Sequence, residues 1–144
     1  MIPLLAGLVL VPVLDQALKL LVLRGLAPAS VPLGPFGKLQ VIRSRIKLAT
    51  SRFRPNPATV WSLWFFAAAS LAVLTGFVPS YGGFAGALLG GSLSHALETS
   101  LRGCIIDYVH LRFWPTFNLA DVAITAGALG VLVQMVMTTT EAWS

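Results

Sequence analysis

Residues 117–138 read FNLADVAITAGALGVLVQMVMT, an apolar run with one charged side chain, Asp121, near its start. A helix gains roughly 1.5 Å per residue, so about 20 such residues cross the hydrocarbon core of a bilayer. Residues 119–138 are therefore predicted to form a membrane-spanning helix. Asn118 can cap the N-terminus of this helix, and Asp121 lies in its first turn, where the helix dipole favours a carboxylate.

A second carboxylate, Asp107, also lies in apolar sequence, directly after Cys104-Ile105-Ile106. A carboxylate at a membrane boundary is costly, so it usually has a partner and a task. Two carboxylates that share a site repel each other, so one keeps its proton, and such a pair can activate a water and protonate a leaving amine. Asp107 and Asp121 are therefore candidate catalytic residues. The spacing alone leaves open that each one caps a helix or meets an arginine.

The composition of the chain indicates a membrane protein. Hydrophobic residues make up 56% of its 144 positions and charged residues 10%, with a mean hydropathy of +0.83. A soluble domain of this size needs far less apolar surface. The net charge of +5 does not favour nucleic acid, because the aromatic residues lie in apolar runs; membrane lipids with anionic headgroups are the simpler partners. The single cysteine, Cys104, excludes an intrachain disulfide framework, and we expect one domain over 1–144.

Four apolar segments are long enough to span a membrane. They cover residues 2–23, 58–78, 83–100 and 119–138, and an extramembrane loop at 24–57 separates the first two. The first segment has neither a basic stretch before it nor a small-residue cleavage site, so we expect a retained helix rather than a signal peptide. An even number of spans places both termini on the same side of the membrane.

Two of these segments carry packing signals. Asp15 and Lys19 lie four residues apart in the first one, on one helical face, and are predicted to form a structural ion pair. In the third, small residues recur every four positions and form a ridge that another helix can approach closely. They are Gly82, Gly86, Gly90 and Ser94.

The loop at 24–57 is predicted to hold a small sheet lying on the membrane. Apolar and polar residues alternate at Leu39/Val41 and again at Ile46/Leu48, as in half-buried strands. Pro55-Asn56-Pro57 should end the loop before the next helix. Residues 101–117 are expected to be only a short polar connection.

The residues around the two aspartates resemble the active-site region of signal peptidase II, the lipoprotein signal peptidase, an aspartic protease of bacterial inner membranes. The match is carried by Asp107-Tyr108 and by Trp114-Pro115-Thr116-Phe117-Asn118-Leu119-Ala120-Asp121-Val122-Ala123-Ile124. Gly90-Gly91 and Asp15-Gln16 with Lys19 extend it over the rest of the chain.

The resemblance implies a fold, a site and a substrate. The fold is an all-α membrane protein with four transmembrane helices and a small β-cradle in the first extramembrane loop, in the bacterial inner membrane. Asp107 and Asp121 fall on the two catalytic positions, and Asp15 with Lys19 on a structural motif. The substrate is a prolipoprotein whose lipobox cysteine carries diacylglycerol, cut just before that cysteine. The chemistry requires no metal and no organic cofactor.

Two stretches depart from the family pattern. The third-span motif Gly-Asn-x-x-Asp-Arg corresponds to Ser94–Thr99, so His95 stands for the asparagine, Glu98 for the aspartate and Thr99 for the arginine. The cradle motif Asn-x-Gly-Ala-Ala-Phe corresponds to Ser44–Ala49, which keeps almost none of it. These changes suggest an alternative function, a proteolytically inactive binding or assembly subunit of a membrane complex. A proton or ion carrier is a third possibility, but spans two and four supply few polar residues for it.

The candidate substrate-binding residues are Asn118, Arg102, Arg43 and Ser44, with Arg45 a further possible source of the missing cation. His95 can replace the asparagine as a hydrogen-bond donor or, as we favour, be a core residue satisfied by a neighbour. His95, Glu98 and Asp107 lack a recognisable zinc-ligand spacing.

The basic residues make a conflicting prediction of orientation. All ten Lys and Arg residues except Lys19 lie in or beside 24–57 and 101–117, and the positive-inside rule places such loops in the cytoplasm. The family places the matching loops on the outer side. We follow the family, because its motif is the more specific signal.

Overall fold

The computed structural model describes residues 1–26, 30–44 and 56–141. Its four helices are α1 (Ile2–Leu26), α2 (Pro57–Phe77), α3 (Gly82–Arg102) and α4 (Leu119–Glu141). Three short strands, β1 (Val31–Pro32), β2 (Gly37–Ser44) and β3 (Ile105–Leu111), form one antiparallel sheet in the order β1-β2-β3. Short 3-10 turns at Gly34–Phe36 and Pro79–Tyr81 precede β2 and α3. The predicted helical membrane fold with a small sheet is confirmed.

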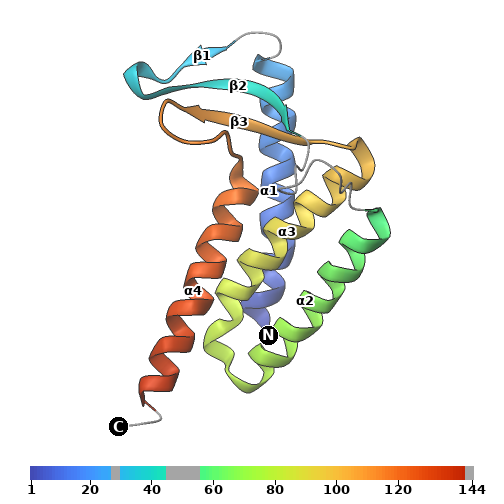
Figure 1. Ribbon diagram of the computed structural model, residues 1–144, viewed down its shortest axis with the longest axis vertical. Coiled ribbons are helices and arrows are strands. Elements are labelled where there is room, and N and C mark those ends of the chain that lie inside the picture. The colour runs from blue at the N-terminus through green and yellow to red at the C-terminus, as the bar shows by residue number, and fades with distance from the viewer. Residues whose placement is uncertain (27–29, 45–55, 142–144) are drawn as a thin grey trace.

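The four helices match the predicted spans closely, and α2 begins at Pro57, where Asn56 caps it by accepting a hydrogen bond from the Ala58 N–H (3.2 Å). Within the described residues, α1, α2 and α4 are long and apolar enough to cross a membrane. The helix α3 is as long as α2 but is not one of these helices, because it is less apolar. It carries His95, Glu98 and Arg102, and it lies among the other helices (Figure 1).

The ridge of small residues on α3 brings the helix axes close together, as predicted. A Cβ added at Gly86 would lie 2.6 Å from the carbonyl oxygen of Leu4 on α1. On the other side of α3, a Cβ at Gly91 would lie 2.6 Å from the carbonyl oxygen of Ala120 on α4. Real Cβ atoms do not approach backbone this closely, so α3 needs glycine on both faces to sit between α1 and α4.

The prediction that 101–117 is only a polar connection is wrong. Its residues Ile105–Leu111 form β3, which pairs with β2 so that Asp107 stands opposite Ile42. The sheet therefore combines the first loop with the connection between α3 and α4. Alternation failed to signal β3 because its first four residues, Ile105 to Tyr108, are all buried on both faces of the strand. The register shift between Leu39 and Ile42 is where the alternation in β2 changes phase, while Ile46/Leu48 lie outside the described residues.

The sheet covers one end of the helix bundle, while the start of α1 and the end of α4 lie at the other end (Figure 1). The same sheet end receives the end of α3 and the beginning of α4. The end of α1, the end of α3 and the beginning of α4 therefore meet at the sheet.

Candidate active site

A hairpin brings the two candidate catalytic residues together. After β3 the chain turns back, and Phe117 pairs with Val109 through two backbone hydrogen bonds of 3.0 Å. This places Asn118, the residue before α4, beside Asp107 on β3. Asp121 follows in the first turn of α4.

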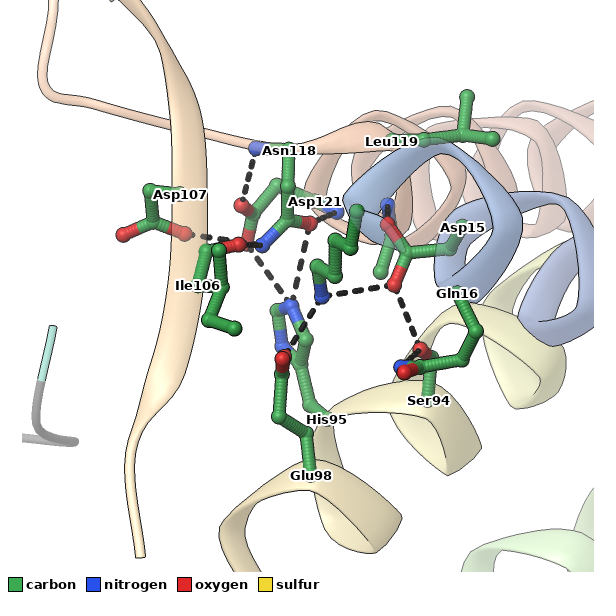
Figure 2. Close-up of polar contacts among 12 residues, drawn as sticks. Asp15, Gln16, Ser94, His95, Glu98, Ile106, Asp107, Asn118, Leu119 and Asp121 are labelled. Atoms are coloured by element: carbon green, nitrogen blue, oxygen red, sulfur yellow. Dashed lines mark hydrogen bonds and ion pairs between the residues drawn. The ribbon is translucent and has the colours of Figure 1, made fainter. Parts of the chain in front are cut away.

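Asn118 joins the two carboxyl groups (Figure 2). Its side-chain Nδ2 donates to Asp107 Oδ1 (2.8 Å) and to the carbonyl oxygen of Ile106 (3.2 Å). Its backbone N–H donates to Asp121 Oδ2 (2.9 Å), and its Oδ1 accepts from the Asp121 N–H (3.1 Å). The last two bonds confirm the predicted helix cap. Asn118 is fully buried, so it holds both carboxyl groups in one fixed arrangement.

The two carboxyl groups differ in exposure. Asp107 is buried, whereas Asp121 is partly exposed, with 38% of its side chain accessible. Asp121 lies at a largely apolar groove of about 400 Å³ between the end of β3 and the outer face of α4. The groove is lined by Leu111, Trp114, Phe117, Asp121, Val122, Thr125, Ala126 and Leu129. An apolar chain lying in this groove would therefore pass one member of the carboxyl pair.

A buried ionic network joins α1 and α3 next to the candidate site. The predicted pair is confirmed: Lys19 Nζ lies 2.7 Å from Asp15 Oδ2, and both side chains are fully buried. Lys19 also binds Glu98 on α3 (2.6 Å), and Arg102 donates to the other Glu98 oxygen (2.9 Å). The network contains two cations and two carboxylates, so the charges balance, as buried charges require.

The network is also connected to the start of α4. Asp15 Oδ1 accepts a hydrogen bond from the Ala120 N–H (3.1 Å), and Asp15 Oδ2 accepts one from Ser94 Oγ (2.6 Å). Gln16 donates to the same Ser94 hydroxyl (2.9 Å). The structural motif in α1 therefore fixes the helix end that carries Asn118 and Asp121.

Tyr108 packs beside this helix end, and its hydroxyl oxygen accepts a hydrogen bond from the Leu119 N–H (3.2 Å). Burial raises the pKa of the Tyr108 phenol, and the negative charges of the nearby Asp15 and Asp121 raise it further. The hydrogen bond from Leu119 lowers it, but by less than burial raises it. Tyr108 is therefore a neutral side chain at physiological pH.

His95 reaches the site from α3. Its Nε2 lies 3.3 Å from Asn118 Oδ1 and 3.6 Å from Asp121 Oδ1, and its side chain is 16% exposed. It is thus largely buried and satisfied by a neighbour, as expected for a core histidine, but its neighbours are the candidate site residues themselves.

The predicted substrate-binding residues lie at different places. Arg102 binds Glu98 one helical turn away, and Asn118 is enclosed between the two aspartates. Arg43 is exposed and pairs with Ile106, so it is placed on the face of the sheet opposite to that of Asp107. The backbone of Ser44 pairs with Ile105, and Arg45 lies outside the described residues. Their roles toward a substrate stay predictions.

Sequence reasoning missed the role of Glu98 as the partner of Lys19. The only local signal is that Glu98 and Arg102 are four residues apart on one helical face. The link from Lys19 to Glu98 joins residues far apart in sequence, so no local pattern shows it. Thr99, which stands where the family has arginine, has a buried hydroxyl without a hydrogen-bond partner in the described part of the chain.

Known proteins resemble this chain over most of its length. The family model described as signal peptidase (SPase) II matches residues 7–137. A lipoprotein signal peptidase of Methylobacterium sp. (strain 4-46) is 34% identical over 137 residues, covering 86% of this chain and 82% of the relative. Another, from Xanthomonas oryzae pv. oryzae (strain PXO99A), is 33% identical over 87 residues, covering 51% and 52%.

The fold also matches that of a solved bacterial membrane enzyme, determined by the in meso method at 2.3 Å resolution. The TM-score is 0.78 at 17% identity, with 96% of this chain and 90% of the other covered. At this identity the likeness bears on the fold alone. The sequence matches carry the assignment: this chain belongs to the signal peptidase II family.

Proposed function

We propose that this protein is an intramembrane aspartic endopeptidase that removes signal peptides from diacylglyceryl-modified prolipoproteins. The names of its relatives support lipoprotein signal peptide processing and therefore a protease. The observation that carries the aspartic mechanism is the position of Asn118, which hydrogen-bonds to both Asp107 and Asp121. The proposed setting is the inner membrane, crossed several times by the chain.

In the proposed reaction, one carboxylate of the pair takes a proton from a water, which attacks the scissile carbonyl carbon. The other carboxyl group, protonated, donates a hydrogen bond to the carbonyl oxygen. The tetrahedral intermediate then collapses as a proton passes to the leaving nitrogen and the C–N bond breaks. Asn118 keeps the two carboxyl groups oriented, since its own bonds fix it on both sides.

The groove beside Asp121 supports the choice of substrate. A lipid-modified prolipoprotein presents an apolar signal helix and acyl chains next to the bond to be cut. A groove with apolar walls and a carboxyl group at one side suits such a chain. We propose that Arg43 and Ser44, at the end of β2, and Arg102 contact the substrate near the membrane surface.

The test is a cleavage assay in detergent or lipid with a diacylglyceryl-modified prolipoprotein, scored by gel shift and by the mass of the product. We expect one cut, just before the modified cysteine. The same prolipoprotein without the lipid is the control and should stay intact.

A second candidate function is a proteolytically inactive binding or assembly subunit in a membrane complex. It is favoured by Thr99, whose buried hydroxyl stands in place of the family's arginine, and by Arg102, which is bound to Glu98. Lack of cleavage by folded protein across several lipobox sequences would support this function against the first.

A further inference from the structure

His95 is a titratable side chain that reaches the carboxyl pair at a position where the family pattern has asparagine. From α3 it points toward Asn118 and Asp121 (Figure 2). Its Nε2 lies 3.3 Å from Asn118 Oδ1 and 3.6 Å from Asp121 Oδ1. Both neighbours are oxygen atoms, which determines whether Nε2 carries a hydrogen.

The orientation of the Asn118 amide identifies its oxygen. Nδ2 donates to Asp107 Oδ1 and to the Ile106 carbonyl, and Oδ1 accepts from the Asp121 N–H. The Asn118 atom that faces His95 is therefore an acceptor. A ring nitrogen between an amide oxygen and a carboxylate oxygen must carry a hydrogen, so Nε2 is protonated in the neutral ring as well as in the imidazolium.

Charged or titratable side chains lie at the sheet end of most elements packed against α3. They are Asp15 and Lys19 on α1, Asp107 and Tyr108 on β3, Asp121 on α4, and Glu98 and Arg102 on α3 itself; α2 has no charged residue. Asp15, Lys19, Glu98 and Arg102 balance one another within their network. Of the carboxyl groups outside this network, that of Asp121 contacts the ring, with its Oδ1 3.6 Å from Nε2.

We propose that His95 is a positioning residue: its Nε2–H bonds to Asn118 Oδ1 and lies close to Asp121 Oδ1, so that it stabilises the Asp121 carboxylate as the ionised member of the pair. The proposal rests on the proposed function. Asp121 Oδ2 accepts a hydrogen bond from the Asn118 backbone N–H (2.9 Å), and the His95 Nε2–H makes an electrostatic contact with Asp121 Oδ1 at 3.6 Å.

The first measurement is kcat and KM of cleavage by the wild type, His95→Asn and His95→Leu. Asparagine can also donate a hydrogen bond, so His95→Asn should keep most of the wild-type kcat. His95→Leu, without a donor, should lose up to about 100-fold in kcat with little change in KM, since the base is no longer held in place. An unchanged kcat in His95→Leu, or a change in KM alone, would overturn the proposal.

The second measurement does not depend on activity. Ring-nitrogen NMR of the protein in micelles should show His95 as the Nε2–H tautomer, and its Nε2 signal should move in Asp121→Asn, because the neighbouring anion is gone. The signals of His110, the other histidine, which lies on β3, should stay in place. His110→Asn serves to assign the two signals and should leave kcat unchanged.

The two measurements separate the two proposals. A His95 Nε2 signal that moves in Asp121→Asn, in a protein that cleaves nothing, would reject the proposed function and keep the His95–Asp121 contact. Cleavage with an unmoved Nε2 signal would reject the contact and keep the function.

Discussion

Lys19 is a charged residue with no exposed surface, held between carboxylates of two different helices. Its ammonium group lies 2.7 Å from Asp15 and 2.6 Å from Glu98. In an apolar interior each of these charges depends on the others, because no water replaces a missing partner. The same network reaches the Ala120 N–H through Asp15, so the position of Asp121 depends on it.

Replacing Lys19 with methionine should therefore be strongly destabilising. The change leaves the Asp15 and Glu98 carboxylates buried and facing each other, which costs about 3–5 kcal/mol. Arg102→Gln is the matched control, since Arg102 binds the same Glu98 but is 35% exposed, and it should cost about 1 kcal/mol or less. The free energy of unfolding in detergent measures both. Equal losses in the two variants would contradict a buried network centred on Lys19.

Tyr108 makes the stability of the protein depend on pH in the alkaline range. Burial holds the pKa of its phenol above the usual value of about 10, so the folded state keeps a proton that the unfolded state loses. The stability from the neutral phenol is complete below about pH 10 and is lost as the pH rises through the folded value. The melting temperature of Tyr108→Phe should consequently fall less steeply than that of the wild type above about pH 10. Parallel curves would contradict this account.

The residue-level chemistry was partly readable from the sequence. Asp15 with Lys19 and the cap by Asn118 follow from local spacing, and both are found in the structure. The contacts of Glu98 with Lys19 and of His95 with Asp121 join distant segments, and they could be recognised only once the helices were packed.

At the scale of elements, α3 determines how the other helices are placed. It contacts α1 and α4 through glycines, and it brings Ser94, His95 and Glu98 to the sheet end of the bundle. The backbone-to-backbone approach is possible only where no side chain intervenes.

A bulky residue on the glycine ridge should separate the helices. A Cβ at Gly90 would meet the Gly7 carbonyl oxygen of α1, whereas a Cβ at Gly83 on the same helix has nothing within 4 Å. Gly90→Leu should therefore lower the melting temperature in detergent sharply and abolish cleavage, because α1 can no longer place Asp15 at Ala120. Gly83→Leu should leave both nearly unchanged. Similar behaviour of the two variants would show that close packing does not position the site.

The helices could be predicted from apolar length, but β3 could not. Its pairing with β2 joins Asp107 to Ile42, residues far apart in the sequence, and its buried residues give no alternation. A strand of this kind is defined by its partner rather than by its own pattern. The hairpin that brings Asp121 to Asp107 was missed for the same reason.

At the scale of the whole molecule, the sheet end carries both the candidate site and most of the basic residues that the structure describes. Two rules predict opposite orientations for that end, the positive-inside rule and the family topology. The proposed substrate is lipid-modified and exported, so we propose that the sheet end lies on the outer side.

Cysteine labelling tests this orientation. In a Cys104→Ser background, a membrane-impermeant maleimide applied to intact spheroplasts should label Arg43→Cys, at the sheet end. It should not label Ser80→Cys, in the turn at the other end. Both positions are exposed in the folded protein. Labelling of Ser80→Cys alone would place the site in the cytoplasm.

The most direct test of the account is a double-mutant cycle on the carboxyl pair, measured as single-turnover cleavage of a diacylglyceryl-modified prolipoprotein. Because the two groups act as one unit, Asp107→Asn and Asp121→Asn should each lower the rate by about 10³-fold or more. The double variant should be no slower than either one. Glu141→Gln, at the end of α4, is the control for loss of a carboxylate away from the site. Wild-type turnover by either single variant, or losses that multiply in the double variant, would contradict the Asp107–Asp121 pair as the catalytic unit.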